Sequence, residues 1–171
     1  MKTSNINSLF NKLTLLIFMA GAALLFSLVT ACDGGDDEVP LIGTEYSISD
    51  IMGSWNASSA TIANLSGGQP GFVDIIDEGG SLTLSIQSNG RFSLTINRPG
   101  RADEIWTGDM GFDEEWLAVR FDGDAADDYS YMFIDLNDVK NFMIIRGDAE
   151  YDFDEDGTEE QASVDLELDR V

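Results

Sequence analysis

Apolar and polar residues alternate with a period of two on both sides of Asn89-Gly90, in the stretch SLTLSIQSNGRFSLTIN at residues 81–97. This alternation is typical of strands with one buried face, and Asn-Gly is a common turn. A two-residue turn here would place Ile86 opposite Ser93, whereas a three-residue loop ending at the glycine places Ile86 opposite Phe92. Only the second register keeps the apolar side chains on one face, so we predict it, with the glycine in the left-handed conformation. The other pairs of this register are Leu84 with Leu94 and Leu82 with Ile96.

The same alternation recurs along the chain beyond residue 46, broken by segments rich in turn formers. We find no sustained helical periodicity there, and the intervening segments read GFDEE, DGDAADD, NDVK and DEDGTEE. About eight short strands with short connections predict an all-β fold, an up-and-down antiparallel β-barrel, because a closed meander leaves no free sheet edge. An open β-sandwich is the alternative. The predicted strands are the hairpin at 81–97 and residues 55–64, 105–110, 116–121, 129–136, 141–147 continuing toward 153, and 162–170.

Every second side chain of these strands is apolar and should point into the barrel. These positions form the expected core. They are Leu82, Leu84, Ile86, Phe92, Leu94, Ile96, Leu117, Val119, Phe121, Met132, Ile134, Leu136, Val164, Leu166 and Leu168.

Residues 1–31 follow a different pattern, with two lysines, no acidic residue and the apolar run LTLLIFMAGAALLFSLV at 13–29. A basic start, an apolar run and small residues at its end predict a secretory signal peptide. An uncleaved membrane helix is one alternative, because the run approaches the length that spans a bilayer. A plain secreted protein is another, although it would leave Cys32, the only cysteine, as a free thiol.

The four residues Val29-Thr30-Ala31-Cys32 resemble the lipobox of bacterial lipoproteins. This resemblance implies cleavage after Ala31 and lipidation of Cys32, which makes a membrane the partner of the lipid, since two or more acyl chains anchor stably. It also implies an extracytoplasmic protein of the bacterial cell envelope, with the outer membrane or cell surface favoured over the inner membrane. The chain would then divide into a signal peptide at 1–31, an acidic flexible tether at 32–45 and the β-barrel domain at 46–171.

Charge narrows the range of partners. The chain has 9 basic and 32 acidic residues and a formal charge of −23, and loss of the two leader lysines would take it to −25. Such a surface repels nucleic acid and anionic lipid, so we exclude both as partners. The excess of carboxylates serves either solubility in high salt or the binding of divalent cations.

The stretch SISDIMGSWNASSATI at residues 47–62 suggests a helical turn followed by the first strand. Its Gly53-Ser54-Trp55 resembles the Gly-x-Trp opening of lipocalins and of lipocalin-like domains in small bacterial lipoproteins. The resemblance covers most of residues 46–171 and implies a calycin-type β-barrel. It also implies that Arg170, near the end of the last strand, packs over Trp55, a contact that cation–π attraction favours. A plain core tryptophan is the alternative interpretation of Trp55.

Acidic residues alternate in DFDEDGTEE, residues 152–160, where Gly157 permits a sharp turn. Calcium takes about six to eight oxygen ligands, which alternate carboxylates and a backbone carbonyl can supply. The segment resembles calcium loops between strands in integrin-type repeats but not an EF-hand, because the position of the closing glutamate is Ser163 here. A solvated acidic hairpin is the alternative, and DGDAADD at 122–128 is a weaker second candidate. The predicted calcium ligands are Asp152, Asp154, Asp156 and Glu160.

No catalytic constellation is recognisable in a chain that has no histidine. The usual general base for serine or cysteine nucleophiles is missing, and we expect a protein that is not an enzyme. We expect a monomeric barrel that binds a small apolar ligand or an envelope partner. A structural envelope protein with a filled barrel is the alternative, and a carboxylate-dependent hydrolase is a further one. The aromatic residues that could line a ligand pocket, or simply cover the core, are Trp106, Trp116, Tyr129 and Tyr131.

Overall fold

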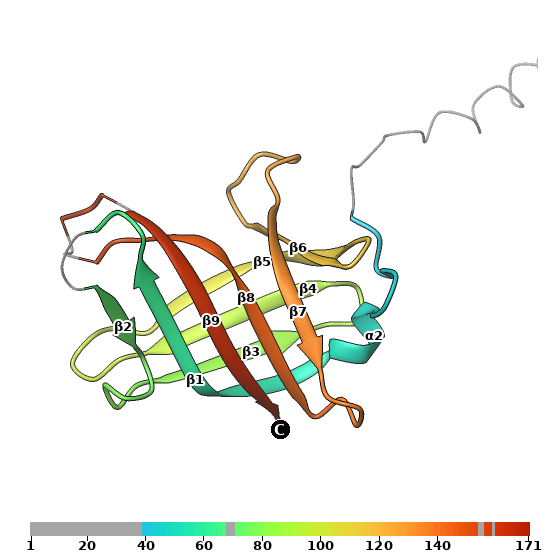
Figure 1. Ribbon diagram of the computed structural model, residues 1–171, viewed down its shortest axis with the longest axis horizontal. Coiled ribbons are helices and arrows are strands. Elements are labelled where there is room, and N and C mark those ends of the chain that lie inside the picture. The colour runs from blue at the N-terminus through green and yellow to red at the C-terminus, as the bar shows by residue number, and fades with distance from the viewer. Residues whose placement is uncertain (1–38, 68–70, 154–155, 159) are drawn as a thin grey trace, which may run out of the picture. The chain divides into compact units, whose positions relative to one another are not determined.

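Nine strands and one short helix make up the fold in the computed structural model, which describes residues 39–67, 71–153, 156–158 and 160–171 (Figure 1). The predicted signal peptide and Cys32 lie outside these residues. No helix among the residues described is long and apolar enough to cross a membrane. The elements are α2 (Ile48–Ile51), β1 (Gly53–Asn64), β2 (Phe72–Asp74), β3 (Ser81–Ile86), β4 (Arg91–Asn97), β5 (Glu104–Asp113), β6 (Trp116–Phe121), β7 (Ser130–Leu136), β8 (Phe142–Tyr151) and β9 (Glu160–Arg170).

The strands form a closed antiparallel barrel. They neighbour one another in the order β2-β1-β3-β4-β5-β6-β7-β8-β9, and β1 also pairs with β9, which closes the sheet. Eight strands, β1 and β3 to β9, form the closed barrel, and the short β2 adds to the far half of β1. The predicted up-and-down barrel is therefore confirmed, and the open sandwich is excluded.

The hairpin register predicted from the alternating pattern is confirmed. Ile86 pairs with Phe92, and the ladder continues without slippage to the far ends of β3 and β4. Gly90 has a φ of 85°, the left-handed conformation, and a Cβ there would lie 2.3 Å from the carbonyl oxygen of Met110. Glycine is thus required at this turn for its backbone angle and for the close approach of β5.

All of the predicted inward side chains belong to one hydrophobic core. Most are buried, and the three that are only partly buried are Leu94, Phe121 and Val164. The core also contains residues that the pattern did not single out, among them Phe112 in β5. The segment GFDEE was expected to be a turn, but β5 continues to Asp113 because Phe112 packs inward opposite Leu117, and the turn shrinks to two residues.

The helix α2 closes one end of the barrel. Its Ile48 and Ile51 are fully buried, as is Trp55 at the start of β1. The helix is only one turn long, and the Asp50 carboxylate stabilises its start by accepting a hydrogen bond of 2.9 Å from the Ser47 N–H. We call this the closed end.

The chain reaches the barrel at the closed end. The Phe112 N–H donates a hydrogen bond of 2.7 Å to the Pro40 carbonyl, and the Thr44 N–H donates one of 2.8 Å to the Glu114 carbonyl. Figure 1 shows α2 and the incoming chain at this end, and the connection between β8 and β9 at the opposite end. The buried apolar residues of the described part of the chain form one hydrophobic core inside this barrel. A segment with its own core is expected to fold without the residues that precede it.

Candidate functional site

The barrel wall has a gap at the end opposite α2, where two neighbouring strands stop short. The pairing of β5 with β6 begins at Gly108 and Phe121, so residues 104–107 of β5 extend beyond it. The pairing of β7 with β8 ends at Met132 and Gly147, so residues 148–151 of β8 extend beyond it. We call the opening between these extensions the portal, and the loop at residues 122–129 lies beside it (Figure 1).

A cavity of about 690 Å³ lies at the portal, and we call it the mouth cavity. Its residues come from the residue after β1, from β5, the end of β6, the loop at 122–129, the start of β7, β8 and the start of β9. Its lining consists of Leu65, Ile105, Trp106, Thr107, Phe121, Asp122, Asp124, Asp128, Ser130, Asp148, Ala149, Glu150, Gln161 and Ala162.

A smaller cavity of about 120 Å³ lies deeper in the barrel, and we call it the inner cavity. Its walls are mainly core side chains such as Leu84, Ile96 and Val119. The two cavities adjoin, because six residues line both: Trp106, Phe121, Ser130, Asp148, Ala149 and Glu150. Solvent therefore meets the apolar interior at this end of the barrel.

Aromatic rings form the boundary between the two cavities. The ring of Trp106 meets that of Phe121 edge to face with centroids 5.7 Å apart, and Phe121 meets Phe92 in the same way at 5.6 Å. Such edge-to-face pairs are favoured by the ring quadrupoles. Trp106 is half-buried, so one part of its surface faces the mouth cavity.

The lining of the mouth cavity is strongly acidic. Five of its residues are acidic: Asp122, Asp124, Asp128, Asp148 and Glu150. Among the residues that the structure describes, neither a lysine nor an arginine lines it. Two of these carboxylates are engaged, since Asp122 pairs with Arg91 and Asp124 accepts a hydrogen bond of 3.0 Å from the Phe121 N–H. In the part of the chain that the structure describes, no ion pair is formed by Asp128, Asp148 or Glu150.

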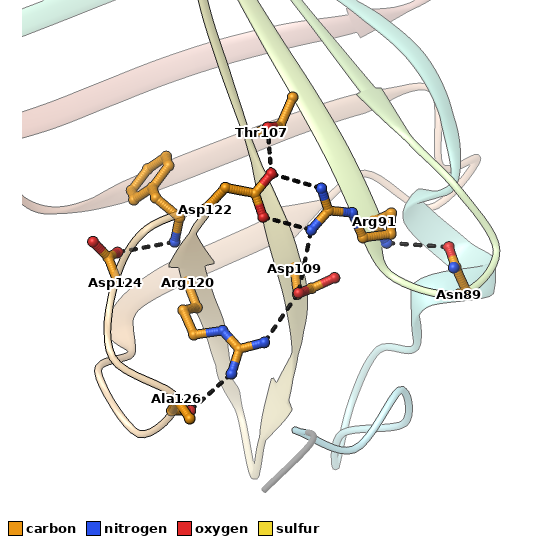
Figure 2. A network of polar contacts seen from close by, with 9 residues as sticks. Asn89, Arg91, Thr107, Asp109, Arg120, Asp122, Asp124 and Ala126 are labelled. Carbon is orange, nitrogen blue, oxygen red and sulfur yellow. Dashed lines mark hydrogen bonds and ion pairs between the residues drawn. The ribbon is translucent and has the colours of Figure 1, made fainter. Parts of the chain in front are cut away.

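An ion-pair network on the outer face of β4, β5 and β6 holds the loop at 122–129, which we call the rim loop (Figure 2). Arg91 binds both oxygens of Asp122, at 2.8 and 2.7 Å, and lies 3.3 Å from Asp109. Arg120 donates a hydrogen bond of 3.0 Å to the same oxygen of Asp109 and one of 2.8 Å to the carbonyl of Ala126 in the rim loop. The hydrogen bond from Arg91, with one from Thr107, holds the pKa of the Asp122 carboxyl well below its usual range.

A buried arginine lies beside the portal. Arg98 is 7% exposed, pairs with Glu104 at 2.5 Å, and has its guanidinium carbon 5.4 Å from the centroid of the Tyr151 ring. Burial opposes its charge, but the hydrogen bond to Glu104 and the nearby ring raise its pKa overall. Burial also raises the pKa of Tyr151. Arg98 does not line the mouth cavity. It lines, with Arg101, a third cavity of about 250 Å³ that shares Trp106 and Glu150 with the mouth cavity.

The four aromatic candidates from the sequence separate into different roles. Trp106 lines both the mouth and inner cavities, as one of the two interpretations predicted. Tyr129 lies under Arg120, with the guanidinium carbon 5.2 Å from its ring centroid. Trp116 and Tyr131 are 45% and 51% exposed on the outer face and line none of the three cavities described above.

The predicted contact between the last strand and the first tryptophan is present. The guanidinium carbon of Arg170 lies 4.3 Å from the centroid of the Trp55 ring, and Trp55 is fully buried. The indole N–H of Trp55 donates a hydrogen bond of 2.7 Å to the Ile51 carbonyl. Arg170 donates to the carbonyls of Met52 and Lys140 at 2.6 and 2.8 Å, so it joins the closed end to the last strand.

In the described residues of the acidic loop at 152–160, carboxylates accept hydrogen bonds from backbone N–H groups of the same loop. The Asp152 carboxylate accepts hydrogen bonds from the N–H groups of Asp156, at 3.2 Å, and Gly157, at 2.9 Å, and Glu160 accepts one of 3.0 Å from the Phe153 N–H. Among the described residues no three acidic, cysteine or histidine side chains lie close enough to hold a metal ion. Asp154 lies outside them, so the calcium site stays a prediction.

No protein-family model and no curated protein sequence matches the chain. The closed eight-stranded barrel is compatible with a lipocalin-like binding barrel, as is the contact between Arg170 and Trp55. The cavities and their acidic lining were not predicted from the sequence. Asp148 and Glu150 are exposed and alternate with inward residues of β8, and this pattern alone does not show that they border an opening.

Proposed function

We propose that this protein is a lipocalin-like binding protein that holds a small apolar ligand in its barrel and is tethered to a membrane through a lipid on Cys32. The observation that carries the proposal is the apolar inner cavity, which adjoins a mouth cavity at the portal. Small barrels are either filled by side chains or hold one small ligand. Ligand sites are commonly concave, largely apolar and bordered by a few polar groups, as here.

The distribution of packing within the barrel supports binding at the portal end. At the closed end Ile51, Trp55 and Leu168 are fully buried and leave no room for a ligand. At the portal end the side chains lining the wall are smaller or only partly buried, such as Ala149 and Val164. A ligand would therefore occupy the portal half of the barrel and leave the closed half undisturbed.

Binding is tested with N-phenyl-1-naphthylamine, a neutral apolar fluorophore, and a chain that starts at residue 33. We expect saturable binding to the parent chain and at least tenfold weaker binding to Ala149→Phe, whose larger side chain would fill the boundary between the cavities. Phe133→Ala, a change on the outer face, is the matched control and should bind like the parent. Absence of saturable binding to a folded parent chain would refute the proposal.

The anchor is tested separately in a bacterial host. The proposal rests on the order of basic start, apolar run, small residue and cysteine in residues 1–32. Cys32→Ser should release the protein from the membrane fraction or leave an unprocessed precursor. Unchanged membrane association, with cleavage still occurring after Ala31, would show that no lipid on Cys32 holds the protein.

A filled barrel with a structural role in the cell envelope is the second candidate. The small volume of the inner cavity, about 120 Å³, favours it, since most of the interior is occupied by side chains. Native mass spectrometry of the protein purified from its own host separates the two candidates. A retained small molecule supports binding, and a bare chain that also fails to take up the fluorophore supports the filled barrel.

A further inference from the structure

We propose that the ligand is an organic cation with an apolar tail, whose positive head lies in the mouth cavity and whose tail enters the inner cavity. This inference rests on the proposed function and concerns the chemistry of the same site. Three features carry it: the sign of the charge around the mouth cavity, the position of Trp106, and the apolar walls beneath it.

The acidic lining of the mouth cavity determines which sign of charge the ligand's head group can carry. Carboxylates are the only charged groups in its lining, and Asp128, Asp148 and Glu150 have no cation paired with them in the described part of the chain. Closely spaced like charges repel, and a cation among them removes that repulsion. A low-dielectric wall on one side strengthens the field felt in such a concavity. A positive head is therefore stabilised here, and a negative one is repelled.

The position of Trp106 selects an organic cation. A cation over an aromatic face is attracted by the ring quadrupole, most strongly for tryptophan, and substituted ammonium groups are well suited to this contact. Trp106 lines both cavities, so a head group in the mouth cavity lies beside its ring while the attached tail passes inward. Phe121, edge to face with Trp106, continues the aromatic surface toward the core.

A bare metal ion fits the same lining poorly. Metal ions need several oxygen ligands converging on one point within about 2–2.6 Å. No three acidic side chains among the described residues converge in this way. Charge that is spread around a cavity of about 690 Å³ suits a bulky cation, whose charge is spread as well.

An anionic amphiphile such as a fatty acid is also disfavoured. It would need a cation at the rim, and Arg98 is the buried one beside the portal. Arg98 is already paired with Glu104 and does not line the mouth cavity. A carboxylate head in the mouth cavity would therefore meet Asp148 and Glu150, while Arg98 and Arg101 lie in the adjoining cavity.

The test compares three ten-carbon compounds that differ in head-group charge: decyltrimethylammonium, 1-decanol and decanoate. Each displaces N-phenyl-1-naphthylamine from the chain starting at residue 33, below the concentration at which it forms micelles. We expect the ammonium compound to bind at least tenfold more tightly than decanol at low ionic strength, and decanoate more weakly than decanol. Salt should weaken the binding of the ammonium compound and leave the binding of decanol unchanged, because only the former depends on charge.

Two variants with the same change in net charge locate the effect. Asp148→Asn with Glu150→Gln should weaken the binding of the ammonium compound at least fivefold and leave the binding of decanol unchanged. Asp77→Asn with Glu78→Gln, in the turn between β2 and β3 and away from the cavities, should leave both unchanged. Trp106→Leu should weaken the ammonium compound more than decanol.

The outcomes distinguish this inference from the proposed function. If decanol or decanoate binds as tightly as the ammonium compound, or if both double variants weaken it equally, the inference of a cationic head is wrong while binding in the barrel stands. If none of the three compounds nor the fluorophore binds, the proposed function fails as well. A preference for the ammonium compound that only the Asp148 and Glu150 variant abolishes supports both.

Discussion

Arg170 is the residue on which the closed end most depends. Its guanidinium covers the face of Trp55 and donates hydrogen bonds to two backbone carbonyls, those of Met52 and Lys140. These carbonyls belong to the end of α2 and to the turn before β8, which have no backbone ladder in common. One planar side chain therefore connects parts of the fold that the sheet does not connect.

Replacing Arg170 by methionine should lower the free energy of unfolding by about 2–4 kcal/mol, because the stacking contact and several charge-assisted hydrogen bonds are lost together. Arg170→Lys should recover only part of this, since an ammonium cannot donate in a planar fork. Urea unfolding of the chain starting at residue 33 measures both. Arg146→Met is the control, expected to cost less than about 1 kcal/mol because its ion pair with Asp165 is half exposed. Equal losses for Arg170→Met and Arg146→Met would contradict this role.

At the scale of elements, the network on β4, β5 and β6 holds the rim loop against the barrel. Arg91, Asp109 and Arg120 lie opposite one another in adjacent ladders, so the register alone brings the three together. Asp122 and the Ala126 carbonyl extend the network into the loop at 122–129 (Figure 2). The loop beside the portal is thereby given a fixed position.

The network predicts a pH dependence. Because the pKa of Asp122 is lowered in the folded protein by Arg91 and Thr107, the stability it contributes is present above its ordinary pKa of 3.8 and is lost as the pH falls below that value. The melting temperature of the parent should exceed that of Asp122→Asn at neutral pH, and the difference should shrink toward zero in strong acid. Asp127→Asn, in the same loop, is the control and should follow the parent at all pH values. A difference for Asp122→Asn that does not vary with pH would argue against the ion pair.

The predicted calcium site in the acidic loop between β8 and β9 can be tested by the response of the melting temperature to divalent cations. If it binds calcium, the melting temperature should rise more with calcium than with magnesium, because a flexible set of oxygens prefers the larger ion. Asp154→Asn with Asp156→Asn should abolish the difference and keep the common rise caused by screening. Equal effects of the two ions on the parent, unchanged by the double substitution, would leave the loop as a solvated hairpin.

The elements also show what could and could not be predicted from the sequence. The register of β3 with β4 was predictable because one turn choice kept Ile86 and its neighbours on one face. The portal was not, because it depends on how far β5 and β8 extend past their pairing with β6 and β7 in the closed barrel, which the alternation does not specify. Trp106 was recognised as a candidate, but its place at the boundary of two cavities follows from three-dimensional closure alone.

For the molecule as a whole, the imbalance of charge should decide the response to salt. The chain has 32 acidic residues against 9 basic ones, so most carboxylates have no cation to pair with. Salt weakens the few surface ion pairs, but it weakens the repulsion among the many unpaired acids more.

We therefore expect the melting temperature of the parent chain to rise steadily as sodium chloride increases from about 0.02 to about 0.5 M, across which the screening length falls severalfold. Potassium chloride should have the same effect, because screening depends on ionic strength and not on the identity of the cation. Sucrose, which adds no charge, separates screening from general exclusion of the solute. A melting temperature that falls over this range would mean that the ion pairs outweigh the repulsion.

The path of the chain at the closed end has a consequence for how the barrel would be presented. The backbone meets the barrel through Pro40 beside Phe112, and the portal lies at the far end of the same strand, β5. A support attached ahead of residue 39, whether a bilayer or a sensor chip, would hold the barrel through its closed end. The point of attachment and the opening would then lie at opposite ends of β5, so the attachment itself would leave the opening free for a ligand to enter and leave.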